Sequence, residues 1–319
     1  MKLLVTGGAG FIGCNFVRYW QAVNPQDFIV VLDKLTYAGS LDNLKGVSNT
    51  HFKFVEGDIC DSDLVSRVLK ENHIEGIINL AALKSVEESK RIPDEYERIN
   101  HLGTKILVDC AILAGVKIFI QSSTAAVYGN SESGFVSETS ELNPISPYGQ
   151  SKVLAEKEVA RFIQEGGRRG TSLRYFNVLG SESPLLKDNS KANVVPMVLE
   201  ALAKGTSPEI FGDDYPTKDG TCIRDYIHVS DIARAHVLAA IKLQSGTLPP
   251  AINIGTGHGY SVREVMGEIL VQSNSRVEPI VNSRRDGDPA VLVSKVELSQ
   301  KVLDFTAHLG LKKMITSSL

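Results

Sequence analysis

The sequence predicts an α/β protein built on a doubly wound parallel sheet of the Rossmann type, with a second, smaller α/β lobe. Along the first half of the chain, short apolar runs alternate with longer amphipathic stretches. Strands that are apolar on both faces are typical of parallel sheets covered by helices on both sides. Five runs have the length and the Val, Ile, Leu and Phe content of such strands, at residues 2–6, 28–33, 52–55, 76–81 and 117–122.

Helical patterns lie between these runs, and their alternation with strands predicts successive strand–helix–strand units. After residue 176 the composition changes, and Gly, Pro and Asp become frequent over residues 205–225. We therefore expect one domain over residues 1–176 and a second, over residues 177–319, that closes over it. The predicted helices cover residues 11–22, 62–71, 92–114, 147–165, 230–243, 262–273 and 294–302.

Composition excludes several classes of protein. The 319 residues include 43% hydrophobic and 22% charged residues, as in an ordinary globular protein. The net charge of -3 gives no reason to expect nucleic acid or an anionic membrane as a partner. No apolar run reaches the roughly 18 residues that span a bilayer, and the N-terminus lacks the pattern of a secretory signal. The four cysteines form no Cys-x-x-Cys pair and the histidines show no metal spacing, so we expect a cytoplasmic protein without a metal site or disulfides.

Three glycines follow the first predicted strand at the spacing Gly7-x-x-Gly10-x-x-Gly13. Glycine has no Cβ, so the turn can tighten and a pyrophosphate can approach the N–H groups at the start of the next helix. Asp33 ends the second strand 20 residues beyond Gly13. A carboxylate there can accept hydrogen bonds from both adenosine ribose hydroxyls and would repel a 2′-phosphate. We therefore predict NAD as the cofactor, with NADP left open by the neighbouring Lys34.

Two further strand ends carry groups that could contact the cofactor. Asp58 follows the third strand, where a carboxylate can meet the adenine amino group; the alternative is a solvated turn aspartate. Lys84 follows the fourth strand, where its ammonium could reach a ribose or a phosphate; the alternative is a surface lysine. In a doubly wound sheet, ligands bind beyond the carboxyl ends of the strands, which favours a cofactor contact at both positions.

Tyr148 and Lys152 form a Tyr-x-x-x-Lys pair directly after Pro147, a residue that suits the first turn of a helix. A spacing of four places both side chains on one helical face. An ammonium beside a phenol favours the phenolate, which can then act as a base towards a sugar hydroxyl. Thr124, at the end of the fifth strand, is our candidate for the hydroxyl that contacts the reacting oxygen, and Ser123 is the rival.

Together, the glycine loop, the Tyr-x-x-x-Lys pair and the Ser-Ser-Thr strand end resemble the extended short-chain dehydrogenases that act on nucleotide sugars. Within that family the pattern is most similar to the 4-epimerases of UDP-hexoses. It implies an NAD-dependent isomerase that interconverts UDP-glucose and UDP-galactose at C4 through a transient 4-keto sugar. The resemblance covers residues 1 to about 303, with specific matches at residues 82–89, 122–129, 174–178, 211–229, 253–257 and 284–289.

The resemblance also implies a role for each site residue. Tyr148 would exchange the proton of the sugar 4-hydroxyl, Lys152 would bind the nicotinamide ribose, and Thr124 would complete the proton-transfer geometry. Other contacts to NAD would come from Gly7, Gly10, Phe11, Ile12, Gly13, Asp33, Asp58, Ile59, Ala81, Ala82, Lys84, Asn100, Ser122 and Tyr175. The arginines suit a diphosphate because a guanidinium forms paired, charge-assisted hydrogen bonds. Other contacts to the UDP-sugar would come from Lys84, Asn177, Asn193, Val194, Phe211, Arg224, Arg285 and Asp288.

Other activities of the same family stay open. Residues 32–44 look more like those of nucleotide-sugar 4,6-dehydratases. Thr124, however, is followed by Ala125 and Ala126, where those enzymes have the acid and base that eliminate water. Epimerases of UDP-GlcNAc, UDP-glucuronate or UDP-pentoses are further alternatives. Leu292 stands where some epimerases have a tyrosine, and a smaller side chain there could admit N-acetylated sugars.

A non-catalytic NAD-binding protein would be a different class, which the presence of both Tyr148 and Lys152 disfavours. The resemblance implies a homodimer formed through the helices at 92–114 and 147–165. Residues 305–319 depart from the usual ending of the family, which leaves the last helix without a prediction. Apolar positions on the two dimer helices fit either an interface or the core: Leu102, Ile106, Leu107, Leu154 and Phe162.

Overall fold

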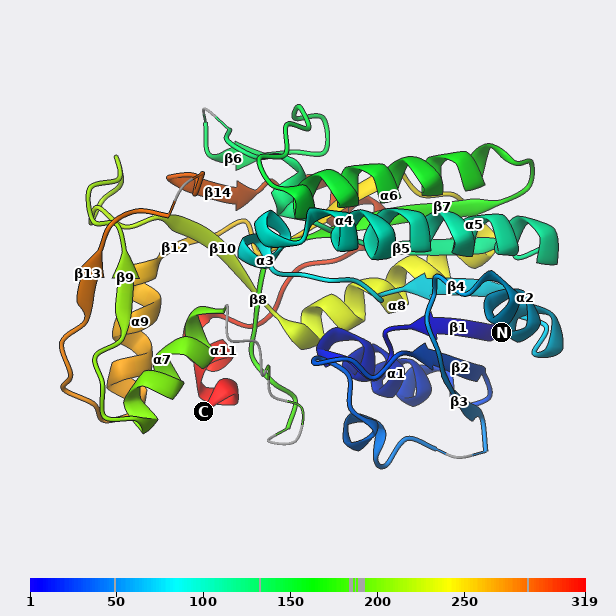
Figure 1. Ribbon diagram of the computed structural model, residues 1–319, viewed down its shortest axis with the longest axis horizontal. Coiled ribbons are helices and arrows are strands. Elements are labelled where there is room, and N and C mark those ends of the chain that lie inside the picture. The colour runs from blue at the N-terminus through cyan, green and yellow to red at the C-terminus, as the bar shows by residue number, and fades with distance from the viewer. Residues whose placement is uncertain (49, 132, 184–185, 187, 189–192, 286) are drawn as a thin grey trace.

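The computed structural model describes residues 1–48, 50–131, 133–183, 186, 188, 193–285 and 287–319. These residues form two lobes that lie side by side along the long axis of the molecule (Figure 1). The larger lobe is built on a seven-stranded parallel sheet, and the smaller lobe contains short strands and the last helix of the chain. This arrangement confirms the two-lobed α/β fold that the sequence predicts.

The large sheet has the strand order β11-β7-β5-β4-β1-β2-β3, and all neighbouring strands run parallel. The winding reverses between β1 and β4, so a crevice opens beyond the carboxyl ends of these central strands. This order is that of a Rossmann-type sheet. Its strands are β1 (Lys2–Thr6), β2 (Phe28–Asp33), β3 (Phe52–Glu56), β4 (Gly76–Asn79), β5 (Ile118–Thr124), β7 (Arg169–Tyr175) and β11 (Ala251–Ile254).

Helices cover both faces of this sheet. Leu3 and Val5 pack into one apolar cluster, Leu4 packs into another, and all three side chains are fully buried. A strand that is buried on both faces needs apolar residues at every position, which explains the continuous apolar runs of the sequence. The first face is covered by α1 (Phe11–Val23), α8 (Val229–Ser245) and α10 (Glu297–Leu303). The second is covered by α2 (Ser62–Glu71), α5 (Gly103–Ala114) and α6 (Pro147–Gln164).

The predicted helix over residues 92–114 is interrupted. Helix α4 (Pro93–Tyr96) is followed by a π-helical segment, Glu97–Leu102, before α5 completes the stretch. The wider π turn carries a buried amide, because Asn100 is 1% exposed and hydrogen-bonds to the backbone of Leu83. Apolar periodicity does not report such a local change of helix type, so the sequence pattern predicts one continuous helix. Helix α3 (Val86–Arg91), just before it, was not predicted.

The smaller lobe has a sheet ordered β12-β10-β14-β6 with β8 beside β10, and a separate pair of β9 and β13. Helix α9 begins with a capping box, in which Ser261 and Glu264 each accept a hydrogen bond from the other's backbone N–H. The strands are β6 (Phe135–Val136), β8 (Asn177–Leu179), β9 (Glu209–Phe211), β10 (Ile223–His228), β12 (Gly259–Ser261), β13 (Ile280–Asn282) and β14 (Val291–Ser294). The helices are α7 (Val194–Ala203), α9 (Val262–Gln272) and α11 (Leu311–Ser318).

The chain crosses between the lobes more than once. Strand β11 is an edge strand of the large sheet, paired with β7, and the buried residues of α8 pack with α1 on one face of that sheet. A single boundary at residue 176 therefore does not follow the layers of the fold. We propose that the first domain comprises residues 1–176 together with α8, β11 and α10, and that the second comprises the rest of 177–319.

Helix α11 completes the smaller lobe at the end of the chain. Its Met314 and Ile315 are fully buried in the core that also contains Tyr226 of β10 and Ile269 of α9. The Ser317 hydroxyl accepts a hydrogen bond from the N–H of Ser181. The segment without a sequence-based prediction is thus a helix that packs onto the strands leading into the site.

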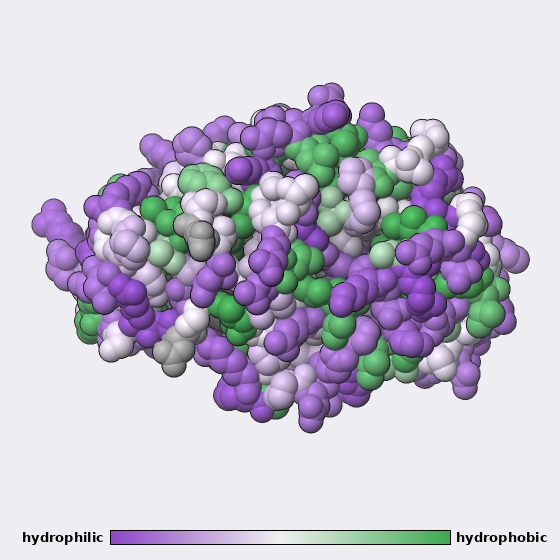
Figure 2. All heavy atoms as spheres, turned by 90° about the horizontal axis from the view of Figure 1, so that it is seen from above, coloured by the Kyte–Doolittle hydropathy of each residue, from purple (hydrophilic) through white to green (hydrophobic). Residues whose placement is uncertain are grey.

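The two helices expected at a dimer interface have both core and surface positions. Leu107 and Phe162 are fully buried in the core of the chain itself, whereas Leu102 is 41% exposed. Figure 2, seen from above, shows apolar residues in separate groups among polar ones. Leu107 and Phe162 are therefore core residues, and positions such as Leu102 are available to a partner. Within the described ranges, no helix is both long and apolar enough to cross a membrane.

The sheet interior should be sensitive to cavity formation at Phe119. Its fully buried ring lies 5.6 Å from the ring of Phe162, so Phe119→Ala should lower the free energy of unfolding by roughly 3–5 kcal/mol. Phe135→Ala is the matched control, because the Phe135 side chain is 48% exposed. Its loss should stay below about 1 kcal/mol. Urea unfolding measures both, and equal losses for the two variants would contradict this account of the core.

Candidate active site

A cavity of about 400 Å³ lies beyond the carboxyl ends of the central strands, between the two lobes. The loop after β1 and the residues after β4 line one part of it, and the ends of β5 and β7 with the start of α6 line another. Residues from both lobes thus surround one space. The predicted residues that line it are Gly7, Gly10, Phe11, Ile12, Gly13, Ala82, Lys84, Ser122, Thr124, Tyr148, Lys152, Tyr175, Asn177, Asn193, Arg224 and Asp288.

The glycine loop packs too closely for side chains. A Cβ at Gly13 would lie 2.2 Å from the carbonyl oxygen of Gly7, and a Cβ at Gly7 would lie 2.6 Å from the backbone nitrogen of Ala81. Gly7 also has a φ of +66°, which side chains disfavour. Gly10 caps α1 without a side-chain hydrogen bond, so the N–H groups of the first turn stay available to an anion.

Asp33 holds the glycine loop at the end of β2. Its two carboxylate oxygens each accept a hydrogen bond of 2.9 Å, one from the N–H of Ala9 and one from the N–H of Leu35. Burial raises the pKa of this carboxyl group. The Lys34 ammonium, which left NADP open, lies 2.8 Å from the carboxylate of Asp58. That charge is therefore engaged by a carboxylate of the protein, which favours a cofactor without a 2′-phosphate.

Tyr148 and Lys152 lie on one face of α6, which begins at Pro147 and is capped by the Ser146 hydroxyl. The Lys152 ammonium donates to the carbonyl oxygen of Ser122 at 3.0 Å and to its hydroxyl at 3.2 Å. Burial lowers the pKa of Lys152 to about 8, although the Glu156 carboxylate opposes this shift. The ammonium is thus held at the end of β5, beside the cavity.

Thr124 and Tyr148 both line the cavity. Burial raises the pKa of Tyr148 to about 12, and a side-chain interaction with Thr124 opposes that rise. The rival hydroxyl, that of Ser123, donates instead to the Glu156 carboxylate at 2.5 Å. The geometry therefore brings Thr124 to Tyr148 and holds Ser123 with a different partner.

Tyr175 has a partner that the sequence did not reveal. Its hydroxyl lies 2.5 Å from Nε2 of His236 on α8. The His236 Nδ1 lies 2.9 Å from the carbonyl oxygen of Ile232, which places the ring proton on Nδ1 and leaves Nε2 to accept from Tyr175. The sequence gives no sign of this contact, because His236 and Tyr175 are 61 residues apart along the chain.

Lys84 is engaged by an unexpected carboxylate. Its ammonium lies 3.2 Å from Oδ1 of Asp188, and the amide of Asn193 donates to the other oxygen of the same carboxylate. Lys84 follows β4 in the large lobe, whereas Asp188 and Asn193 precede α7 of the smaller lobe. One carboxylate therefore joins two predicted ligand-binding residues across the cavity.

Some predicted cofactor contacts lie behind the cavity lining. The Asn100 amide hydrogen-bonds to both backbone groups of Leu83 and to the hydroxyl of Ser151. Ile59 is buried against Gly103 of α5. Asn100 thus shapes the loop that leads to Lys84, and its direct contact with a cofactor stays a prediction. The same holds for the other predicted residues outside the lining, Asp33, Asp58, Ile59 and Ala81.

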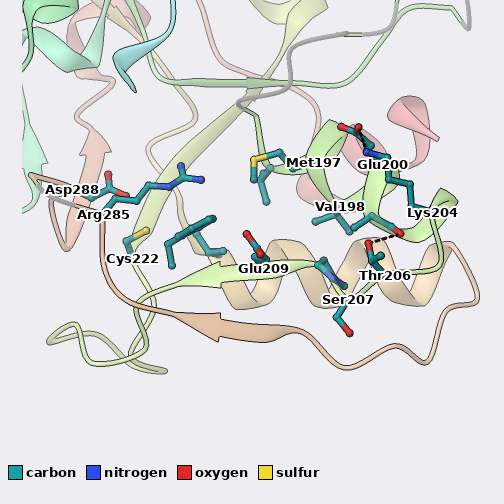
Figure 3. A pocket seen from close by; sticks show the side chains of 15 residues that line it. Met197, Val198, Glu200, Lys204, Thr206, Ser207, Glu209, Cys222, Arg285 and Asp288 are labelled. Carbon is teal, nitrogen blue, oxygen red and sulfur yellow. Dashed lines mark hydrogen bonds and ion pairs between the residues drawn. The ribbon is translucent and has the colours of Figure 1, made fainter. Parts of the chain in front are cut away.

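A second pocket of about 340 Å³ adjoins the cavity in the smaller lobe (Figure 3). Asp288 lines both spaces, and its carboxylate forms an ion pair of 2.7 Å with Arg224. The Arg285 guanidinium lies 4.0 Å from the centre of the Phe211 ring. Val194 lines the same pocket. Cations, an aromatic ring and apolar groups together suit a ligand that combines negative charge with a flat ring.

No metal site is found among the described residues, since none of their His, Cys, Asp and Glu side chains form a group of three or more that could bind an ion. The polar groups that line the cavity include hydroxyl, ammonium and guanidinium groups. Tyr148, Lys152 and Thr124 meet at the end of a parallel sheet, beneath a cation-lined pocket. Fold and site together define a Rossmann-type enzyme with a Tyr–Lys pair in the lining of its cavity.

Comparison with known proteins places the chain in a family. Residues 3–255 match the model of the NAD dependent epimerase/dehydratase family, and the chain belongs to that family. The UDP-glucose 4-epimerase of Bacillus subtilis is 37% identical, over 100% of this chain and 96% of the relative. The UDP-glucose 4-epimerase of Haemophilus influenzae is also 37% identical, over 99% of this chain and 95% of the relative.

Solved structures agree with this assignment. The UDP-glucose-4-epimerase of Stenotrophomonas maltophila, with bound NAD and formylated UDP-arabinopyranose, superposes with a TM-score of 0.92 at 34% identity, over 100% of this chain and 96% of that one. The UDP-Glc/GlcNAc 4-epimerase of Campylobacter jejuni superposes with a TM-score of 0.86 at 35% identity, over 99% of this chain and 97% of that one. The similarity therefore extends over both lobes.

The buried imidazole of His236 should make the protein acid-labile. Burial lowers the pKa of His236 to about 4 from an ordinary value of 6.5. Between these values the unfolded chain binds the proton and the folded chain does not. Stability is therefore lost as the pH falls from 6.5 towards 4, by about 3 kcal/mol from this group.

The variant His236→Gln isolates that contribution, because glutamine does not titrate in this range. Urea unfolding should show that the wild-type protein loses about 3 kcal/mol more than the variant between pH 7 and pH 4. Carboxylates that titrate in both proteins cancel in this comparison. A stability difference that stays constant with pH would contradict the prediction.

Proposed function

We propose that this protein is an NAD-dependent epimerase that interconverts UDP-glucose and UDP-galactose at C4 through a transient 4-keto sugar. The observation that carries the proposal is the meeting of Tyr148, Lys152 and Thr124 at the floor of a cavity that shares Asp288 with the pocket of Arg285 and Phe211. Curated relatives that align over nearly the whole chain are UDP-glucose 4-epimerases.

The cofactor of this enzyme is NAD, and the residues present fit it. The uncapped first turn of α1 offers N–H groups to the pyrophosphate, and the glycines leave room for it to approach. Asp33 stands at the end of β2, where it can meet the adenosine ribose. Lys152 and Tyr175 line the same cavity as the glycine loop, where they would contact the nicotinamide ribose and ring. When bound there, NAD would supply the redox chemistry, with a hydride taken from C4 and given back to the opposite face of the sugar.

Tyr148 exchanges the proton of the 4-hydroxyl. Without further positive charge its pKa of about 12 would leave the phenol protonated at neutral pH. The positive charge of oxidised nicotinamide, bound beside the phenol, would favour the phenolate, which can then act as a base. The Thr124 side chain also opposes the rise in the pKa of Tyr148, so it favours the negative charge on the same oxygen. The protonated phenol then returns the proton when the sugar is reduced again.

The UDP group is held away from the reacting carbon. Arg224 and Arg285 suit the diphosphate, and the Phe211 ring with Val194 and the apolar part of the second pocket suits the uracil. Holding the ligand by its nucleotide leaves the 4-keto sugar free to turn about its bond to the diphosphate. That rotation presents the other face of the ring to the cofactor, as epimerisation requires.

The residues after Thr124 favour epimerisation over dehydration. Ala125 and Ala126 line the cavity, and neither can act as the additional acid or base that eliminating water needs. The nucleotide-sugar 4,6-dehydratase alternative is therefore not supported at the site. A non-catalytic NAD-binding protein is also not supported, because the full Tyr–Lys–Thr set is assembled.

We further propose that the enzyme acts in the cytoplasm as a homodimer. All four cysteines, at positions 14, 60, 110 and 222, are free thiols, as a reducing compartment requires. Exposed apolar side chains around the interrupted helix, including Ile92, Leu102 and Leu113, offer a surface for a second copy. Sedimentation of the purified protein tests the proposal, and a monomer at micromolar concentration would overturn it.

The activity is tested with purified protein and UDP-galactose, without added NAD. We expect conversion to UDP-glucose, because the cofactor is restored in each turnover and can stay bound. Conversion that appears after NAD is added would show weaker retention of the cofactor. No conversion with or without NAD would overturn the proposed function.

Tyr148→Phe tests the mechanism in the same assay. Removing the phenolic oxygen should lower kcat by about 100-fold or more, since a positioned acid–base group contributes that much. Tyr260→Phe is the matched control, because Tyr260 lies on β12 and lines neither cavity. A Tyr148→Phe variant with full activity would refute the mechanism and leave the fold assignment intact.

A second substrate is favoured by Leu292. This side chain lines the cavity and packs with Ala125 and Phe176, so the space at the sugar end is larger and more apolar than it would be with a tyrosine there. The similar Campylobacter jejuni protein is named a UDP-Glc/GlcNAc 4-epimerase. We therefore propose that this enzyme also accepts UDP-GlcNAc.

Leu292→Tyr should lower kcat/KM for UDP-GlcNAc by about 10- to 100-fold and that for UDP-galactose much less, because only the N-acetyl group needs the space. Val271→Tyr, at a position 71% exposed on α9, should change neither. Wild-type activity on UDP-GlcNAc below about one per cent of that on UDP-glucose would refute the proposal.

A further inference from the structure

A buried ion pair lies directly behind the catalytic side chains. The Glu156 carboxylate accepts two hydrogen bonds from the Arg174 guanidinium, at 2.9 Å from Nε and 2.6 Å from Nη2. The Arg174 side chain is 5% exposed and that of Glu156 is 10% exposed. Neither residue lines the cavity, and the mechanism above uses neither of them. A buried pair of this kind gives little net stability, but it can specify one arrangement of the groups around it.

The pair holds the chain on both sides of Thr124. On the N-terminal side, the Ser123 hydroxyl donates to Glu156 at 2.5 Å. On the C-terminal side, Arg174 Nη1 donates to the Tyr128 hydroxyl at 2.9 Å. The short turn that carries Thr124 is therefore attached at both ends to one ion pair. A shift of Glu156 or Arg174 would move the Thr124 hydroxyl relative to Tyr148.

The same pair also determines where the other catalytic groups stand. Glu156 follows Lys152 by one helical turn and Tyr148 by two, so all three lie on the same face of α6. Arg174 directly precedes Tyr175 at the end of β7. The ion pair thus ties α6, which carries Tyr148 and Lys152, to the strand ends that carry Thr124 and Tyr175.

A second layer supports the pair. The Tyr128 hydroxyl donates to the Asn253 side chain at 2.6 Å, and the Asn253 amide donates to the carbonyl oxygen of Val136 at 3.0 Å. Tyr128 and Asn253 are 2% and 0% exposed. The hydrogen bonds that join Arg174, Tyr128, Asn253 and Val136 are all buried, which makes their geometry hard to disturb. The Glu156 carboxylate also opposes the fall that burial causes in the pKa of Lys152.

We propose that Glu156 and Arg174 are positioning residues of the active site. They hold the Thr124 hydroxyl and the Tyr148–Lys152 pair in the relative positions that proton transfer needs. This inference rests on the proposed epimerase function. Neither residue touches the cavity, so both act through the residues they hold. Displacing a reacting group by about 1 Å can cost up to 100-fold in rate.

Ser123→Ala is the decisive variant, because it removes one attachment of Thr124 without leaving a buried charge unpaired. We expect kcat for UDP-galactose to fall about tenfold, with KM changed less than twofold and the bound NAD per chain unchanged. Ser123→Thr retains the hydroxyl and should restore most of kcat. Glu156→Gln removes the charge that neutralises Arg174, so it should lower kcat further and also lower Tm.

Glu158→Gln is the matched control on the same helix. Glu158 pairs with Arg161 and lies near His101, away from the cavity, so its loss should leave kcat unchanged. Each rate is divided by the concentration of folded, NAD-loaded protein, so that a loss of stability alone does not lower the value. A purely structural role would then leave the corrected kcat unchanged.

The outcomes separate this inference from the proposed function. If the wild-type protein does not convert UDP-galactose, the proposed function fails. If the wild type is active and Ser123→Ala keeps kcat within twofold, or changes KM alone, the positioning role of Glu156 and Arg174 is overturned. A fall in kcat with unchanged KM, restored by Ser123→Thr, supports it.

Discussion

Seven parallel strands end at one edge of the large sheet, and this constraint places almost every functional side chain. Asp33 ends β2, Thr124 ends β5 and Tyr175 ends β7, although they are far apart along the chain. Because the strands run in the same direction, their carboxyl ends form one rim, over which the smaller lobe adds Arg224 and Asp288. The site is therefore complete only when the whole sheet is assembled.

Burial of charge is the second constraint, and it ties the chemistry to the packing. Lys152 is 2% exposed, and its ammonium has the carbonyl and hydroxyl of Ser122 as partners. The Arg174 guanidinium is also buried, and its partner is the Glu156 carboxylate. A buried ion without a partner is costly, so the places of these partners decide where the catalytic helix sits on the sheet. Removal from water also shifts the pKa of Lys152 down to about 8 and that of Tyr148 up to about 12.

Much of the fold and part of the site could be predicted from local pattern. The apolar runs, the glycine spacing and the Tyr–Lys spacing each reflect neighbours along the chain, and the strands 2–6 and 28–33 and the helix 62–71 have the predicted bounds. The π-helical interruption around Asn100 and the return of α8 and β11 to the large lobe were missed. Both depend on what the segment packs against, which apolar periodicity does not report.

The sequence by itself determined the Rossmann class and the likeness to the epimerase family, and it named most of the residues that line the cavity, because these follow from short-range spacing. The glycine loop after β1 shows the limit of what local spacing can predict. The spacing of its glycines is evident in the sequence, but the contacts that exclude a side chain at Gly7 and Gly13 exist only in the folded chain. Folding also decided that Thr124 faces Tyr148 while Ser123 binds Glu156, and that His236 holds Tyr175. Such pairings join groups that are distant in sequence, so they are set by which strands and helices become neighbours.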